Sequence, residues 1–304
     1  MKVKELVLFA LPVMLMSACG SEEVTQVAIN QKVPLQVTSG ILTRAAGSQW
    51  QKDDAIGIFM LKAGSASISE SAVNRRYTTS DGSTSFAATS DQTIYYPIDG
   101  SQVDFVAYYP QQTLTDGVMT LDVSSQSSLP AIDVMYAETA STTVAPLDKD
   151  HPQVAFNFSH RLTKLELTIA PGKGLQASDL KGLKVELTNQ RTHGSYYPLI
   201  DGIDIAATPV QTVVLNTNAG GTASEAILLP ATSATDISPV VPGRELLFTL
   251  AATGEVFRWA IPDTKYFNQG DRNIYNITIN RTGVDVTATI SDWNTENGGD
   301  VNAN

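Results

Sequence analysis

The 304-residue chain contains a single cysteine, Cys19. One cysteine cannot form an internal disulfide, and it cannot supply a cysteine-rich zinc site. Histidine is also scarce, because only His151, His160 and His193 are present and none has the spacing of a His-x-x-x-His metal motif. We therefore expect no metal and no cofactor.

Positive charge is in short supply, with 20 Lys and Arg against 31 Asp and Glu. Proteins that bind nucleic acid need concentrated Lys and Arg to contact phosphates, so the composition argues against nucleic acid as a partner. The sequence has no Gly-x-Ser-x-Gly, P-loop or dinucleotide fingerprint. Ser159 and His160 are adjacent, but neighbours on a strand point to opposite faces and cannot act as nucleophile and base. We expect a non-enzymatic protein.

The beginning of the chain has the layout of an export signal. Lys2 and Lys4 precede the apolar segment 6–16, which is shorter than the ~20 residues that span a bilayer. The next letters, "MSAC", resemble a bacterial lipobox, in which the cysteine is acylated and becomes the mature N-terminus. We expect residues 1–18 to be a lipoprotein signal peptide and palmitate on Cys19 to hold the protein on the outer membrane, because each buried methylene adds ~0.8 kcal/mol. The alternative is an ordinary cleaved signal with an incidental cysteine.

The rest of the chain alternates apolar and polar residues, which is typical of strands. Examples are "QVDFVAYYP", "TKLELTIAP", "NIYNITINRT" and "GVDVTATISDWN", separated by "DG" and "PG" turn signals. Many short strands with such turns favour an all-β fold of sandwiches. A polar segment around "LDKDHPQ" predicts a boundary between two domains in tandem, 45–152 and 153–304.

Several stretches together resemble the fimbrillin superfamily. They are, in order, "ILTRAAGSQWQKDDAIGIFM", "IYYP", "VDFVAYYP", "VAFNFSHRLTKLELTI", "ILLPA" and "ISDW". They cover almost the whole mature chain, and their order behind a lipobox makes the resemblance specific. It implies two transthyretin-like β-sandwich domains and a place among type V pilus subunits or related adhesive surface proteins.

The resemblance also implies a route of assembly. Fimbrillins reach the outer membrane surface as lipoproteins, and a trypsin-like protease cuts polymerising subunits after an early arginine. Here Arg44, followed by Ala45, is the sole basic residue between Lys32 and Lys52. We expect the cut there, which makes 19–44 a propeptide. The removable strand within it would present three apolar side chains: Val33, Leu35 and Val37. The emptied groove would accept a strand from another pilin subunit.

The donated strand in such stalk subunits lies at the C-terminus. The equivalent segment here has an alternating apolar face made of Val284, Val286, Ala288 and Ile290. The tail after it, "NTENGGDVNAN", is polar, unlike the long apolar tail of a stalk subunit, so stalk, tip and anchoring positions all stay open. A different class of function is a lipid-anchored adhesin that binds a host glycan or protein and never polymerises. Three tyrosine pairs could stack on sugar: Tyr95–Tyr96, Tyr108–Tyr109 and Tyr196–Tyr197. In each pair we expect one ring to face the core and the other to cover the surface.

Overall fold

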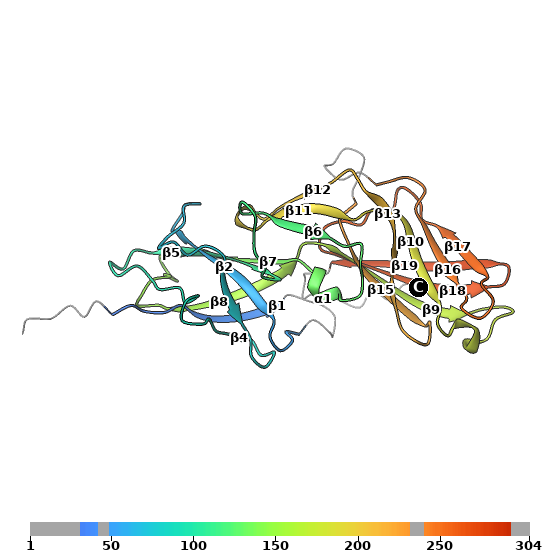
Figure 1. Ribbon diagram of the computed structural model, residues 1–304, viewed down its shortest axis with the longest axis horizontal. Coiled ribbons are helices and arrows are strands. Elements are labelled where there is room, and N and C mark those ends of the chain that lie inside the picture. Colours follow the sequence, from blue (N-terminus) through green and yellow to red (C-terminus); the bar gives the residue numbers. More distant parts are fainter. Residues whose placement is uncertain (1–30, 42–48, 232–239, 293–304) are drawn as a thin grey trace, which may run out of the picture. The chain divides into compact units, whose positions relative to one another are not determined.

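The computed structural model describes residues 31–41, 49–231 and 240–292 (Figure 1). The predicted lipid site, Cys19, and the predicted cut between Arg44 and Ala45 lie outside these residues. The described residues are almost entirely strands and connecting turns, which confirms the all-β prediction. The transthyretin-like arrangement in two domains remains a prediction.

The N-terminal part is a seven-stranded sheet in the order β3-β2-β5-β7-β8-β1-β4. Its strands are β1 (Gln36–Ile41), β2 (Ala55–Lys62), β3 (Arg75–Thr78), β4 (Ser85–Phe86), β5 (Val103–Tyr109), β7 (Met135–Thr139) and β8 (Gln153–His160). Its two ends meet, because Thr78 and Ala87 exchange two backbone hydrogen bonds of 2.9 Å. A sheet that closes in this way protects its edges. The first hydrophobic core lies inside it, around Ile56, Phe105 and Phe156.

The C-terminal part has two sheets that share a second core, around Leu167, Phe248 and Ile277. The five-stranded sheet contains, in spatial order, β14 (Asn216–Thr217), β15 (Ala223–Leu228), β9 (Thr163–Pro171), β18 (Asp271–Asn280) and β19 (Gly283–Asp292). The four-stranded sheet contains β13 (Val210–Val214), β10 (Lys184–Arg191), β16 (Glu245–Thr249) and β17 (Val256–Ala260). The strand predictions from alternation in this part are confirmed.

A small sheet and a third core connect these parts. The sheet contains β12 (Gly202–Ile205), β11 (His193–Tyr197) and β6 (Met119–Asp122). The third core collects Phe59 and Tyr108 from the first sheet, Tyr196 from the small sheet and Ile227 from β15. Short helical segments complete the described fold: α1 (Leu129–Ile132), η1 (Ala177–Leu180) and η2 (Pro198–Ile200).

The chain passes between the large sheets at Arg161 and Leu162. The stretch "VAFNFSHRLTKLELTI" is therefore two strands, β8 and β9, which pair in different sheets. The domain boundary at 152/153 remains a prediction. Arg161 donates from Nε to Asp201 at 2.7 Å, and the Leu162 side chain is fully buried in the third core. The break is stabilised by contacts distant in sequence, so local alternation does not reveal it.

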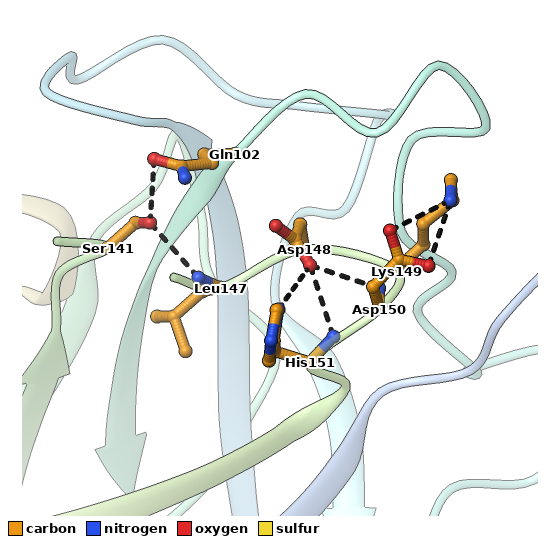
Figure 2. A network of polar contacts seen from close by, with 7 residues as sticks. All are labelled: Gln102, Ser141, Leu147, Asp148, Lys149, Asp150 and His151. Carbon is orange, nitrogen blue, oxygen red and sulfur yellow. Dashed lines mark hydrogen bonds and ion pairs between the residues drawn. The ribbon is translucent and has the colours of Figure 1, made fainter. Parts of the chain in front are cut away.

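The polar segment that suggested a boundary is a tight turn leading into β8 (Figure 2). Asp148 accepts hydrogen bonds at Oδ1 from the backbone amides of Asp150, at 3.0 Å, and His151, at 3.1 Å. The Ser141 hydroxyl anchors the start of the turn by accepting from the Leu147 amide at 3.0 Å. An aspartate that caps its own turn is a usual turn device.

Candidate functional site

Strand β1 lies inside the first sheet, between β8 and β4. It runs parallel to β8, with six residues in register, and antiparallel to β4, with two. Val37 is paired on both sides, with Val154 of β8 and Phe86 of β4. The strand therefore joins two neighbours that do not pair with each other.

The inward side chains of this segment fill the first core. Leu35 and Val37 are each 5% exposed, and Val33 packs against the core in a partly buried position. The strand continues beyond Val37, since Ser39 is 3% exposed and Ile41 also packs against the core. The letters "TSG" look like a turn in isolation. Ile41 is the sequence signal that the strand extends beyond Val37, because it continues the apolar alternation across them.

Backbone hydrogen bonds tie β1 and the residues before it to three parts of the sheet. The Leu35 amide donates to the Ile94 carbonyl at 2.9 Å, and the Ser39 amide donates to the Thr84 carbonyl at 2.8 Å. On the other side, the Gln36 amide donates to the Pro152 carbonyl at 2.9 Å. Removing the segment would leave the partner groups unpaired, and a buried unpaired polar group costs ~1–3 kcal/mol.

An aromatic cluster lies beside the second half of β1. The Trp50 indole donates from Nε1 to the Ser39 carbonyl at 3.4 Å. Its ring meets Phe86 and Phe158 edge-on, with centroids 5.1 and 5.5 Å apart. Trp50 also meets Tyr109, whose pKa is raised by burial and by the neighbouring Asp54 carboxylate.

A cavity of about 490 Å³ lies at the end of β1 and is lined by residues including Ile41, Trp50, Asp133 and His160. His160 is 1% exposed, and its Nδ1 lies 2.9 Å from Asp133 Oδ1. The pairing gives His160 a structural role, and Ser159 binds elsewhere, to the Tyr136 carbonyl and to Arg161. Within the described parts of the chain, no group of three or more potential metal ligands comes together.

Charged groups on β9, β15 and β18 form the other wall of this cavity. Lys164 lies 2.9 Å from Glu166 and 3.2 Å from Glu225, and Arg272 lies 2.6 Å from Glu166. Burial alone would raise the pKa of Glu166, but the hydrogen bonds from Arg272 and Lys164 outweigh it and hold that pKa below 4.5. Burial would lower the pKa of Lys164, but Glu166 and Glu225 raise it. The network therefore favours the charged forms of Glu166 and Lys164.

This network predicts an acid-sensitive contribution to stability. A carboxylate whose pKa is depressed by folding contributes fully above its unfolded pKa, and the contribution is lost as the pH falls through the folded pKa. Glu166→Gln should therefore lower the free energy of unfolding at neutral pH and much less at a pH well below 4.5. Urea unfolding of the full chain at both pH values measures this, with the exposed Glu70→Gln as control. Equal losses at both pH values would contradict it.

The predicted donor segment forms β19, an edge strand. It pairs with β18 over ten residues, from Gly283 opposite Asn280 to Asp292 opposite Asp271. Within the described residues, its other edge has no paired strand. The predicted apolar face is unevenly covered: Val284 and Val286 are half-buried against the second core, Ala288 is exposed and Ile290 is 47% exposed.

Most of the tyrosine rings considered for sugar binding are buried. Tyr108 and Tyr109 are both buried, so the expectation that one ring of each pair covers the surface is wrong for this pair. Tyr95 is 36% exposed beside a buried Tyr96, as expected. Tyr196 is fully buried in the third core. No described helix has the length and apolar character needed to cross a bilayer.

Comparisons with known proteins give one consistent result. The model of the fimbrillin-like family matches residues 43–293. A Bacteroides uniformis protein with the provisional name fimbrium subunit Fim1C is 38% identical over 316 residues, covering 100% of this chain and 99% of its own. A crystal structure of a provisionally assigned cell adhesion protein of the same species has a TM-score of 0.74 at 38% identity, covering 87% of this chain and 99% of that one. The tip fimbrial protein Mfa3 of Porphyromonas gingivalis, with a C-terminal truncation, shares the fold, with a TM-score of 0.50 at 13% identity over 86% of this chain and 100% of its own.

Proposed function

This chain belongs to the fimbrillin-like family, and on that premise we propose that it is the precursor of a pilus subunit that assembles by donor-strand exchange. Its relatives are fimbrial or adhesion proteins, which act at the cell surface without catalysis. The precursor is exported, acylated at Cys19 and held on the outer membrane. A trypsin-like protease then cuts between Arg44 and Ala45, and the mature subunit joins other pilin subunits in an adhesive fimbria.

The observation that carries this proposal is the position of β1 in the chain and in the sheet. The strand is internal in the sheet, yet it ends at Ile41, a few residues before Arg44. A single cut after Arg44 therefore separates the whole strand from the rest of the fold. Strands that are internal in a sheet and also near a chain end can be exchanged without rearranging the other connections.

The loss of β1 would destabilise the first sheet, and it would open a groove that another strand can fill. Leu35 and Val37 stop filling the first core, and burying such a side chain is worth about 1.5–3 kcal/mol. The facing edges of β8 and β4 also lose their backbone partners. An apolar groove between two unpaired edges is a template for strand addition. The free energy of filling the groove would drive assembly without a nucleotide.

A second function rests on a different observation. The ten paired residues of β19 and β18 hold the donor segment in its own sheet. If it never leaves, the chain is a lipid-anchored surface adhesin that binds a host protein or glycan and does not polymerise. An intact, acylated Cys19 on every surface-extracted molecule would favour this alternative.

The proposed function is tested by blocking the cut. Treating the purified precursor with a trypsin-like protease should produce an N-terminus at Ala45, detected by mass spectrometry, and a ladder of SDS-resistant oligomers. Arg44→Ala should abolish both. Lys52→Ala, which removes the next basic residue along the chain, should leave both unchanged. An unchanged ladder from Arg44→Ala would show that this residue is not the processing site.

A further inference from the structure

The cavity at the end of β1 has two walls that differ in charge. The wall formed by β9, β15 and β18 is neutral, because two glutamates there pair with Lys164 and Arg272. The opposite wall carries two more carboxylates, those of Asp54 and Asp133. Within the described residues, neither of these carboxylates forms an ion pair with a lysine or an arginine. The cavity therefore carries two carboxylates in excess of its lysine and arginine side chains.

The hydrogen-bond partners of Asp54 and Asp133 supply no permanent positive charge. Asp54 accepts at Oδ1 from the Tyr109 hydroxyl, at 3.0 Å, and at Oδ2 from the Gln51 backbone amide, at 2.6 Å. Asp133 Oδ1 lies 2.9 Å from His160 Nδ1. Burial raises the pKa of Tyr109, and the charges of Asp54 and Asp133 raise it further, so both carboxylates act on the same hydroxyl. Carboxylates held near one another repel, so a positively charged ligand would stabilise this wall.

We infer that this cavity binds an arginine side chain of a partner protein, with the guanidinium against Asp54 and Asp133. The cavity volume of about 490 Å³ lies within the range of ligand pockets, ~300–1,000 Å³. A guanidinium offers five N–H donors in a planar fork that matches carboxylate geometry, and it keeps its charge. The charge excess therefore selects a cation, and the two carboxylates favour the guanidinium. Binding of this kind does not depend on strand exchange and goes beyond the proposed function.

The apolar part of the lining suits the stem of the same side chain. Arginine packs its methylene groups along apolar surface while its charged head reaches polar groups. Met135 and Ile227 line the cavity and are 3% and 2% exposed, so they lie in its interior. Leu129 of α1 is half-buried and Pro130 is exposed, so this side of the lining reaches the solvent. A side chain that enters past α1 would therefore meet apolar surface along its stem.

The neutral wall limits which side chains can bind. Glu166 and Glu225 lie directly opposite each other on β9 and β15, an arrangement that is destabilising for like charges. Lys164 Nζ bridges them, at 2.9 Å from Glu166 and 3.2 Å from Glu225. An aspartate or glutamate of a partner would face carboxylates on both walls, and the cations that could bind it are already paired. The cavity should therefore reject acidic side chains.

Fluorescence anisotropy with two labelled peptides measures this binding. The first peptide is acetyl-Gly-Gly-Arg-Gly-Gly-amide. The second has citrulline in place of arginine, which keeps the shape of the side chain and removes its charge. Both are titrated with the purified precursor carrying Arg44→Ala, in which the proposed cut is blocked. Asp133→Asn is then added to this chain, with Asp116→Asn as the matched control, because Asp116 is exposed and is not among the residues that line the cavity.

The arginine peptide should bind roughly tenfold more tightly than the citrulline peptide, because a hydrogen bond between charged groups is stronger than one with a neutral donor. Asp133→Asn should weaken binding of the arginine peptide by a similar factor, and Asp116→Asn should leave it unchanged. Equal binding of the two peptides, or binding of neither, would overturn the inference, as would full affinity in a folded Asp133→Asn variant. The peptide comparison uses the unsubstituted cavity, so it decides the matter even if Asp133→Asn does not fold. Since this precursor stays uncut, a negative result leaves the proposed function standing.

Discussion

Replacing Val37 by aspartate should unfold the precursor or destabilise it by several kcal/mol. The side chain is 5% exposed and lies in the first core, so the substitution removes about 1.5–3 kcal/mol of apolar burial. It also buries a carboxylate without a counter-charge, which adds a further penalty of several kcal/mol. The total is a large part of the 5–15 kcal/mol that usually separates folded from unfolded protein.

The neighbouring residue provides the matched control. Thr38 is exposed on the opposite face of β1, so Thr38→Asp should cost under about 1 kcal/mol. Urea unfolding of the two variants and of the unsubstituted precursor gives the comparison. If Val37→Asp is as stable as Thr38→Asp, β1 does not contribute to the core in solution.

Once the segment released by a cut after Arg44 has dissociated, the free energy of unfolding of the subunit should be lower. The decrease should be larger than that caused by a single conservative substitution in β1. Its departure removes Leu35 and Val37 from the core together, and it unpairs the edges of β8 and β4. While the segment remains bound after the cut, the subunit should keep most of its stability, because the contacts are unchanged. Urea midpoints should therefore be near that of the precursor directly after cutting. The urea midpoints should fall when dilution, or a competing strand that fills the groove, lets the segment dissociate.

Local alternation was sufficient to predict most strands, because β-strands with one buried face repeat every two residues. Residues 271–280 follow that rule and form β18. Strand β5 departs from it, because Val106 and Tyr108 on its second face are buried in the third core. The burial of Leu35 and Val37 follows it too. The all-β fold could be predicted from the sequence for this reason.

Other features depend on contacts that local patterns do not encode. The pairing of β1 with β8 joins residues more than a hundred positions apart, as Thr38 and Val154 illustrate. The break after β8 is stabilised by the contact of Arg161 with Asp201, and the Ser39 carbonyl in β1 accepts a hydrogen bond from the Trp50 indole. The turn capped by Asp148 is another such feature, because a turn and a linker use the same residue types.

The central claim is that β1 completes the first sheet only until another strand takes its place. Native mass spectrometry of the cut protein, during oligomer growth, tests it most directly. The account predicts that the cut monomer retains the fragment ending at Arg44, and that every link formed in an oligomer releases one fragment. Oligomers that keep one fragment per subunit would contradict it, because the groove would then still be filled by its original strand.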